Sequence, residues 1–286
     1  MENVLWADAP AKINLTLDVL GKRADGYHEV ETIMHKITLF DRIRIRPGEN
    51  IKVSSNDQTI AWDHTNLVYR AADLILGYAK KLKGVDIYVE KNIPIAAGLA
   101  GGSTDAAATL TGIERLYGLE LSEAELFSLA AELGSDVPFC LDFGPKTAFA
   151  KGKGEKLEAV EFPMILNLVL AAPLFSLSTA QVFNRLDLRQ IKKRPLHARF
   201  LQTLKAGSLK EMAPYMENVL ETVSLAMCPD IERVKRRIEK AGAIKTLMSG
   251  SGPSVFGIFA DESKARQAMR QIKACDIAEV FLVSSY

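Results

Sequence analysis

Cysteine is scarce in this sequence, with three residues in a chain of 286. They stand apart at Cys140, Cys228 and Cys275, and no Cys-x-x-Cys pair occurs. This pattern excludes a disulfide framework and a cysteine metal site, so we predict that each cysteine is a small core residue. The four histidines also lack the spacing of metal ligands.

The sequence also lacks an excess of positive or negative charge, and it lacks long apolar runs. The formal net charge is +1 and no basic block appears, which argues against nucleic acid as the main partner. No apolar run reaches the length of a membrane span, and the first residues lack the apolar segment of a signal peptide. We therefore expect a cytoplasmic protein without membrane contact. Hydrophobic residues make up 48% of the chain, enough for one large or two ordinary domains.

The most informative stretch is rich in glycine and lies between a strand pattern and a helix pattern. Val85–Glu90 alternates in the manner of a strand, and the alanine-rich Asp105–Tyr117 predicts a helix. Between them, Gly98, Gly101 and Gly102 let the backbone bend and leave amide N–H groups uncovered. A glycine turn that leads into a helix N-terminus is typical of a phosphate site.

Two common phosphate-binding motifs do not fit this stretch. The P-loop requires a lysine directly after its last glycine, and none follows here. The dinucleotide fingerprint requires Gly-x-Gly-x-x-Gly, whereas the spacing here is Gly-x-x-Gly-Gly. From the residues alone, a plain strand-to-helix turn remains the alternative.

A second candidate segment lies near the start of the chain. Ala11–Leu20 alternates apolar and polar residues, which predicts a half-buried strand. Lys12 and Asn14 then project from the same polar face. An ordinary solvent-facing strand would show the same pattern.

The next segment contains an aromatic pair. Asp25-Gly26 predicts a turn between strands, so Tyr27 and His28 lie at or near a loop. There they can stack on a planar ring and form hydrogen bonds with it. A capped hairpin without a ligand is an equal alternative.

One aspartate follows a predicted helix. Ser122 predicts the N-cap of that helix, and Gly134 its end. Pro138 biases Val137 toward extended geometry, so Asp136 is expected in a short connector, where functional residues are often displayed. A simple turn aspartate is the alternative.

The remaining patterns mix strands and helices in an α+β order. We predict further strands at residues 31–40, 41–46, 165–171, 243–248, 254–259 and 278–283. We predict further helices at residues 65–82, 178–186, 229–241 and 261–274, and a helical region at 194–216 that Gly207 and Pro214 interrupt. Turns are expected at Pro47–Asn50 and at the glycine-rich Ser249–Pro253.

Three motifs occur in the order typical of the galactokinase, homoserine kinase, mevalonate kinase and phosphomevalonate kinase (GHMP) superfamily. Pro94-Ile-Ala-Ala-Gly-Leu-Ala-Gly-Gly-Ser-Thr-Asp-Ala resembles its phosphate loop. Ala9-Pro-Ala-Lys-Ile-Asn-Leu and Ser249-Gly-Ser-Gly-Pro-Ser resemble its N-terminal strand motif and C-terminal glycine loop. The resemblance implies an α+β, two-domain GHMP kinase fold. Residues 1–160 would form an N-terminal domain like ribosomal protein S5 domain 2, with the ATP phosphate loop, and residues 161–286 a ferredoxin-like α/β sandwich.

Five shorter segments resemble one family within this superfamily, the 4-diphosphocytidyl-2-C-methyl-D-erythritol kinases of non-mevalonate isoprenoid and terpenoid biosynthesis. The segments are Pro10-Ala-Lys-Ile-Asn-Leu, Arg23-Ala-Asp-Gly-Tyr-His, Asn66-Leu67, Gly134-Ser-Asp-Val-Pro and Phe149-Ala-Lys-Gly-Lys-Gly-Glu. The chain departs from the usual family pattern, by small changes, at Ala96, Ala97, Ala100, Thr104 and Ser135. The resemblance implies transfer of a phosphoryl group from ATP, with Mg²⁺, to the 2-hydroxyl of a cytidine diphosphate derivative of methylerythritol, by a monomer or homodimer.

The same resemblance implies roles for individual residues. Asp136 would be the base that accepts the hydroxyl proton, and Lys12 would lie beside it. The ATP-binding residues would be Asn66, Leu67, Lys91, Pro94, Ile95, Ala96, Ala97, Gly98, Leu99, Ala100, Gly101, Gly102, Ser103 and Thr104. The substrate-binding residues would be Asn14, Tyr27, His28, Thr179, Phe183, Asn218, Ser249, Gly250 and Gly252. Ser103 would supply a hydroxyl near Mg²⁺.

Three other interpretations remain open. A GHMP kinase for mevalonate or homoserine would share the phosphate loop, although the segment from Asp25 to His28 suits a substrate that carries a nucleobase. A non-catalytic sensor on the same fold would be expected to lose Lys12 or Asp136, and both are present. A generic α+β protein with incidental glycine turns would not need three ordered motifs.

Overall fold

The computed structural model describes residues 4–79, 83–274 and 277–286. They form two compact units whose segments alternate along the chain. Unit 1 comprises the residues up to Ala11, Leu39–Pro94 and Ala100–Pro145, and unit 2 comprises Lys12–Thr38, Ile95–Leu99 and Lys146–Tyr286. The predicted domain division at residue 160 remains a prediction. Leu82 and Cys275, predicted as a helix end and a core residue, lie outside the described residues.

The strands of unit 1 form a mixed sheet. β3 (Lys52–Ser55) runs parallel to β4 (Gly84–Glu90), and β4 pairs antiparallel with the second half of β2 (His28–Gly48). The β2–β4 register runs from Arg42 opposite Glu90 to Gly48 opposite Gly84. β1 (Leu5–Lys22) also pairs with β2.

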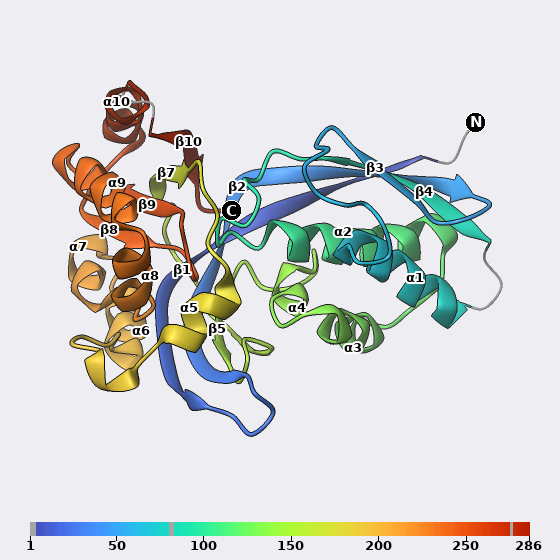
Figure 1. Cartoon of the computed structure of the whole chain (residues 1–286), viewed down its shortest axis with the longest axis horizontal. Helices are drawn as coiled ribbons and strands as arrows, with labels where there is room; N and C mark the ends of the chain where they lie inside the picture. Colours follow the sequence, from blue (N-terminus) through green and yellow to red (C-terminus); the bar gives the residue numbers. More distant parts are fainter. Residues whose placement is uncertain (1–3, 80–82, 275–276) are drawn as a thin grey trace. The chain divides into compact units, whose positions relative to one another are not determined.

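Four helices of unit 1 lie together on one face of its strands (Figure 1). They are α1 (Leu67–Ala79), α2 (Gly101–Tyr117), α3 (Glu123–Leu133) and α4 (Val137–Cys140). α2 is central and contacts the other three. A Cβ on Gly112 would lie 2.4 Å from Ile45 Cδ1, so α2 approaches β2 more closely than a larger residue allows. This close packing holds the second half of α2 against the sheet.

Unit 2 contains two groups of antiparallel strands. Residues 32–35 of β2 pair with β5 (Thr147–Lys151), which pairs with β6 (Lys156–Ala159). A second sheet has the order β10 (Ala278–Ser284), β7 (Asn167–Pro173), β9 (Val255–Phe259) and β8 (Lys245–Met248).

Two amphipathic helices cover the second sheet, α9 (Pro229–Lys240) and α10 (Glu262–Lys273). Both lie on the same side of it in Figure 1. Their buried residues Ile231, Val234, Ile238, Ala265, Ala268 and Ile272 share one core with sheet residues such as Val169 and Phe259. The 3.6-residue spacing of the apolar positions thus places the core of unit 2 between these helices and the sheet.

The other helices of unit 2 are short. They are α5 (Thr179–Arg185), α6 (His197–Lys205), α7 (Leu209–Met212), α8 (Glu221–Met227) and the 3₁₀ turns η1 (Leu188–Gln190) and η2 (Ala213–Tyr215). The predicted interruption of the 194–216 region is confirmed. Gly207 separates α6 from α7 with φ +71°, and Pro214 lies in η2.

The predicted break after Phe40 is wrong, because β2 continues through Asp41 to Gly48. Alternate residues stay buried across the expected break, including the Asp41 side chain. That carboxylate accepts the N–H groups of Asn92 and Ile93 and pairs with Lys91, so its charge is compensated inside the sheet. The turn predicted at Pro47–Asn50 begins later than expected, because Pro47 and Gly48 still pair with β4, whereas Glu49 and Asn50 form a bend after the strand.

Other predicted boundaries also differ from the structure. Val137 is not extended but begins the helix α4, and Pro138 is tolerated there because the first helical turn needs no N–H donor. α2 begins at Gly101 rather than Asp105, and β1 extends beyond Ala11–Leu20 at both ends. Ser122 caps α3 with the capping box that the sequence predicted.

Two cysteines can be compared with the prediction. Cys140 is buried, and Cys228 packs against the core of unit 2. The predicted role as small core residues is confirmed for these two. Among the residues that the structure describes, no helix is long and apolar enough to cross a membrane.

Candidate active site

Lys12 and Asn14 lie on one strand, as the alternating pattern predicted, but the prediction of a half-buried strand is wrong, because both residues are buried and so are their apolar neighbours. Lys12 Nζ donates to Asn14 Oδ1 over 2.8 Å, and Asn14 Nδ2 donates to Thr32 Oγ1 over 2.8 Å. Thr32 Oγ1 donates in turn to the Thr16 carbonyl over 2.6 Å. These bonds fix the orientation of the Asn14 amide, because the Lys12 ammonium can only donate. The result is a preorganised positive charge inside unit 2.

Two glycine turns meet in unit 2, one at Ile95–Leu99 and one at Ser249–Ser254. Ser249 Oγ donates to the Gly98 carbonyl over 2.9 Å. A Cβ on Gly98 would lie 2.3 Å from the Ser249 carbonyl oxygen, and Gly98 has φ +77°. Glycine is therefore required at this position for both space and backbone conformation.

The same turns are attached to the strand that carries Lys12. The backbone N–H of Lys12 donates to the Leu99 carbonyl over 3.1 Å. A Cβ on Gly250 would lie 3.5 Å from Asn14 Oδ1. The structure thus brings the predicted residues of the N-terminal strand, the phosphate loop and the C-terminal glycine loop together.

Asn218 is buried and orders the second glycine turn. Its Nδ2 donates to the carbonyls of Met248 and Gly250 over 2.9 and 2.8 Å, and its Oδ1 accepts the Leu220 N–H over 3.0 Å. Both amide protons are engaged by the protein, so Asn218 supports the loop backbone. Thr179 Oγ1 lies 2.9 Å from Ser251 Oγ, which links α5 to the same turn.

Two of the three aromatic residues predicted to meet a nucleobase form a ring pair. The His28 and Phe183 rings have centroids 5.1 Å apart at an interplanar angle of 35°. The Tyr27 side chain is 57% exposed, and Lys153 Nζ lies 4.7 Å from its ring centroid. Burial and the nearby Lys22 charge lower the pKa of His28, which favours the neutral imidazole. Neutral imidazole offers one donor and one acceptor to a ligand.

In unit 1, the first turn of α2 fits a phosphate group. The N-cap residue Ala100 has φ 59° and ψ 27° and supplies no side-chain cap. The Thr104 N–H bonds to the Ala100 carbonyl over 2.9 Å, so the N–H groups of Gly101, Gly102 and Ser103 precede the helical hydrogen bonds. An anion here would satisfy these amides and the positive end of the helix dipole.

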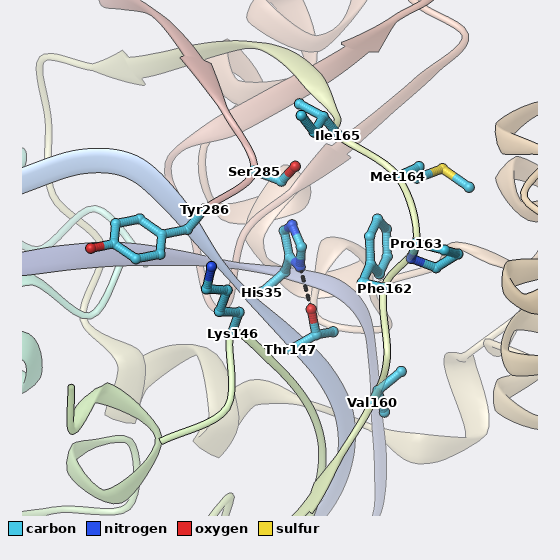
Figure 2. A pocket seen from close by; sticks show the side chains of 10 residues that line it. All are labelled: His35, Lys146, Thr147, Val160, Phe162, Pro163, Met164, Ile165, Ser285 and Tyr286. Carbon is cyan, nitrogen blue, oxygen red and sulfur yellow. Dashed lines mark hydrogen bonds between the residues drawn. The ribbon is translucent and has the colours of Figure 1, made fainter. Parts of the chain in front are cut away.

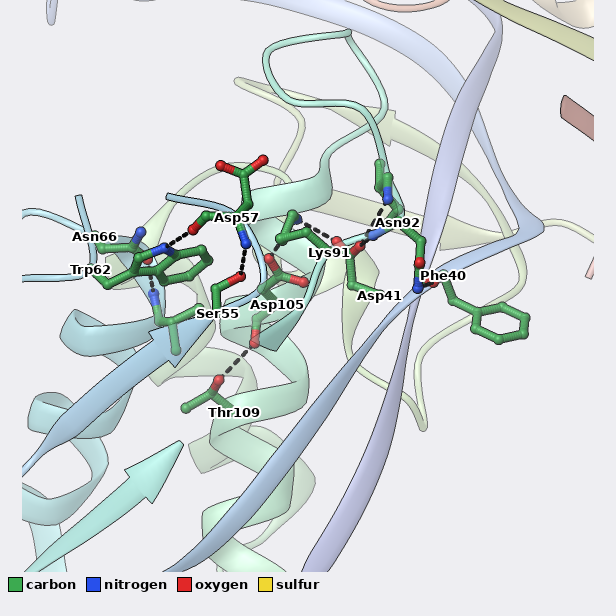
Figure 3. A network of polar contacts seen from close by, with 12 residues as sticks. Phe40, Asp41, Ser55, Asp57, Trp62, Asn66, Lys91, Asn92, Asp105 and Thr109 are labelled. Carbon is green, nitrogen blue, oxygen red and sulfur yellow. Dashed lines mark hydrogen bonds and ion pairs between the residues drawn. The ribbon is translucent and has the colours of Figure 1, made fainter. Parts of the chain in front are cut away.

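Lys91 reaches two buried carboxylates, one on β2 and one on α2 (Figure 3). Its Nζ pairs with Asp41 Oδ2 and lies 2.8 Å from Asp105 Oδ2. Asp41 Oδ1 also accepts the N–H groups of Asn92 and Ile93, over 2.5 and 2.8 Å. The sequence predicted Lys91 near adenine but did not identify this network, because no local pattern links its members.

Burial shifts the pKa values of the charged groups in this network. Burial opposes the charge on Lys91, but the attraction of Asp105 and Asp41 outweighs it and raises the pKa of Lys91. Burial and the repulsion of Asp41 raise the pKa of Asp105 well above its usual range, against the attraction of Lys91. Asp105 Oδ1 has no hydrogen-bond partner among the described residues. Asp105 is therefore the carboxylate of this network that gains most from protonation.

Asn66 and Leu67 lie at the start of α1. Asn66 Oδ1 caps the helix by accepting the Val68 N–H over 2.9 Å, and Nδ2 donates to the Ala61 carbonyl over 2.8 Å. Leu67 Cδ1 lies 3.7 Å from the position of a Cβ on Gly102. Trp62 belongs to the polar contacts drawn in Figure 3, where its Nε1 donates to the Asp57 carbonyl over 2.8 Å, and the sequence did not single out this aromatic residue.

Asp136 lies in unit 1 at the N-cap of α4, with φ −86° and ψ −16°. Its carboxylate does not cap the helix, and the residue is half-buried. Lys12 belongs to unit 2, so the predicted approach of Lys12 to Asp136 remains a prediction. Ser103 lies in the first turn of α2, and among the described residues no cluster of three His, Cys, Asp or Glu side chains is arranged to hold a metal.

Comparison with known proteins finds family matches in both halves of the chain. The family model for the GHMP kinases N terminal domain matches residues 66–143, and that for GHMP kinases C terminal matches residues 200–277. A 4-diphosphocytidyl-2-C-methyl-D-erythritol kinase of Syntrophomonas wolfei is 50% identical over 97% of both chains. One of Caldicellulosiruptor saccharolyticus is 45% identical over 97% of this chain and 95% of its own. The chain belongs to the 4-diphosphocytidyl-2-C-methyl-D-erythritol kinase family.

Solved structures agree with this family assignment. A crystal structure of 4-(cytidine 5'-diphospho)-2C-methyl-D-erythritol kinase has a TM-score of 0.84 at 33% identity, and covers 98% of this chain and 99% of its own. A homoserine kinase from Cytophaga hutchinsonii has a TM-score of 0.78 at 20% identity over 100% of this chain and 95% of its own, and shares the fold. The predicted GHMP kinase fold is confirmed.

Membership of the 4-diphosphocytidyl-2-C-methyl-D-erythritol kinase family also makes the chain an ATP-dependent small-molecule kinase. Within unit 2 the structure gathers Lys12, Asn14, Gly98, Ser249, Gly250 and Asn218. Within unit 1 it gathers Asn66, Leu67, Lys91, Gly101 and Gly102. The individual contacts of these residues with ATP or an acceptor remain predictions.

Proposed function

We propose that this kinase transfers a phosphoryl group from ATP to the 2-hydroxyl of 4-diphosphocytidyl-2-C-methyl-D-erythritol, giving the 2-phosphate and ADP. The reaction would serve isoprenoid precursor synthesis in the cytoplasm. The observation that carries the proposal is the 50% identity over 97% of the chain to a relative named for this substrate. The geometry supports it through the buried Lys12 ammonium, which is fixed beside two glycine turns.

ATP would lie with its phosphates at the first turn of α2. ATP with Mg²⁺ supplies the γ-phosphoryl group and neutralises part of the phosphate charge. The N–H groups of Gly101, Gly102 and Ser103 would donate to phosphate oxygens, because no side chain caps them. The Ser103 hydroxyl would lie near Mg²⁺, an ion that accepts phosphate oxygens and water as its other ligands. Asn66 and Leu67 would flank the adenine.

The acceptor would bind in unit 2. His28 and Phe183 already form a tilted ring pair, and the neighbouring residue in the sequence, Tyr27, has an exposed ring. These three aromatic side chains suit a flat pyrimidine that needs stacking and directed hydrogen bonds. Asn14 would orient the sugar-alcohol end of the substrate from its fixed position beside Lys12.

Asp136 would act as the general base. Its carboxylate would accept the hydroxyl proton while the substrate oxygen attacks the γ-phosphorus. Lys12 would orient the hydroxyl and balance the charge of the carboxylate. In phosphoryl transfer the protein contributes mainly positioning and charge stabilisation, which is what a fixed lysine and an uncapped helix offer.

The test is ADP release from ATP and Mg²⁺ with four acceptors: diphosphocytidyl-methylerythritol, mevalonate, homoserine and galactose. We expect turnover with the cytidine compound alone. Turnover with another acceptor would refute the substrate assignment while leaving the kinase class intact. Binding of ATP without turnover on any acceptor would favour a ligand sensor on the same fold.

A second experiment tests the proposed contact between His28 and the nucleobase of the substrate. His28→Ala should raise KM for the cytidine substrate more than KM for ATP, because the His28 ring lies with Phe183 in the proposed acceptor site. Equal changes in both KM values would remove His28 from pyrimidine recognition.

A further inference from the structure

A pocket of about 630 Å³ lies within unit 2, and neither Lys12 nor any other residue predicted for phosphoryl transfer lines it (Figure 2). Its lining comes from β2, the start of β5, the segment 160–165 and the end of the chain after β10. None of the predicted ATP-binding or substrate-binding residues lines it. Its size falls in the range of pockets that hold small organic ligands.

His35 supplies a buried polar atom to this pocket. The residue is 2% exposed, and its Nδ1 lies 2.7 Å from Thr147 Oγ1. Figure 2 shows the other ring nitrogen on the side turned away from Thr147. That atom, Nε2, has no hydrogen-bond partner among the described residues. Buried polar atoms are nearly always hydrogen-bonded, so an unpaired nitrogen at a pocket wall favours a ligand that supplies the partner.

Among the side chains that line the pocket, Lys146 is the one that carries a charge at neutral pH. No Asp or Glu side chain is among the residues that line it. Lys146 is exposed, with Nζ 5.5 Å from the Tyr286 ring centroid, and it forms no ion pair with the described residues. His35 adds no charge there, because burial lowers its pKa to about 4. The pocket therefore suits an anion at the Lys146 side.

The opposite wall of the pocket is apolar. The segment 160–165 has neither helix nor strand and presents Val160, Phe162, Pro163, Met164 and Ile165 in sequence. The Phe162 ring centroid lies 4.5 Å from that of His35, and Ile165 is 75% exposed. An aromatic ring and an exposed branched side chain beside a cation suit a flat apolar ligand body.

We propose that this pocket is a second ligand site, for a planar aromatic monoanion that carries a hydroxyl group. The ring system would lie against Phe162 and Ile165, the anionic group would pair with Lys146, and the hydroxyl would bond to His35 Nε2. The site is independent of the acceptor proposed above, since the two share no residue.

The probe is 6-hydroxy-2-naphthoate, whose binding is followed by calorimetry and by its fluorescence. Two analogues separate the contacts: 2-naphthoate lacks the hydroxyl, and 6-hydroxy-2-naphthamide lacks the charge. We expect one probe per chain, with affinity lower by about fivefold for each analogue, since each loses one hydrogen bond or one exposed ion pair. ATP should not displace the probe.

Two exposed lysines provide matched variants. Lys146→Gln should weaken the naphthoate by about fivefold but leave the uncharged naphthamide unaffected. Lys192→Gln, also exposed but outside the pocket, should change neither affinity. His35→Phe should abolish the advantage of the hydroxyl, and the Lys146 variant still tests the site if that core change prevents folding.

Three results would overturn the proposal. The first is no saturable binding of the probe to the folded kinase. The second is displacement of the probe by ATP, which would place it in the nucleotide site. The third is equal affinity of the probe for the wild type and Lys146→Gln together with no effect of removing the hydroxyl.

Discussion

The Lys91 ammonium lies 2.8 Å from Asp105 Oδ2, with side chains that are only 6% and 2% exposed. Lys91 follows the last residue of β4, and Asp105 is the fifth residue of α2. Their contact, together with the Asp41 pair, joins strand, loop and helix next to the first turn of α2. A buried network of this kind orders its surroundings even where its net stabilisation is small.

The two carboxylates of this network should differ in their effect on stability. Asp41→Asn should lower the free energy of unfolding by about 2 to 4 kcal/mol, because the Asp41 carboxylate pairs with Lys91 and accepts hydrogen bonds from two backbone N–H groups. Asp105→Asn should cost about 1 kcal/mol or less, because it relieves repulsion between two buried carboxylates. Urea unfolding at neutral pH measures both. An equal or larger loss for Asp105→Asn would contradict this account of the network.

His35 should make stability depend on pH. Its folded-state pKa of about 4 lies below the ordinary value of 6.5, so the unfolded chain binds the proton more strongly. The stability that His35 contributes is therefore complete above pH 6.5 and is lost as pH falls toward 4. The difference between 6.5 and about 4 corresponds to roughly 3 kcal/mol.

Unfolding in urea at pH 7 and at pH 4.5 tests this expectation. His35→Gln should reduce the difference between the two pH values, whatever its effect at pH 7. An unchanged difference would show that His35 is accessible to protons in the folded protein.

The proposed base can be tested without disturbing nucleotide binding. Asp136→Asn should lower kcat by at least about 100-fold while ATP affinity stays within a small factor, since removal of a general base affects the chemical step. Asp142→Asn, a nearby aspartate that pairs with Arg115, is the matched control and should keep normal turnover. Stopped-flow or steady-state ADP release measures kcat, and equilibrium titration measures ATP affinity. Near-normal turnover of Asp136→Asn would exclude it as the base.

Gly98 should tolerate no side chain. Gly98→Ala should lower the free energy of unfolding by at least about 2 kcal/mol, because a Cβ would lie 2.3 Å from the Ser249 carbonyl oxygen and φ is +77°. Gly207→Ala is the control, since Gly207 has a similar φ of +71° but no atom within 4 Å of its Cβ position. That variant should lose about 1 kcal/mol, the conformational cost alone. Equal losses in thermal or urea unfolding would mean that the loop moves away from Ser249.

Local structure in this protein follows from short stretches of sequence. The alternation around Lys12 and Asn14 predicted their common face, and the Ser122 capping box and the amphipathic pattern of α9 predicted helices. Such signals involve residues within about one helical turn or a few strand positions, so they can be recognised without knowledge of the fold. Motif order then indicated the kinase family, which the relatives bear out.

Contacts between distant residues were decided only by tertiary structure. Lys91 and Asp41 are 50 positions apart, and Ser249 and Gly98 are 151 positions apart. Nothing local indicates that Asp41 continues a strand or that His35 lines a pocket. Burial decides such features, because it makes every unpaired charge or polar atom costly and so selects partners across the fold. The sequence determined most strands and helices, whereas packing determined where several of them begin or end and which polar groups meet.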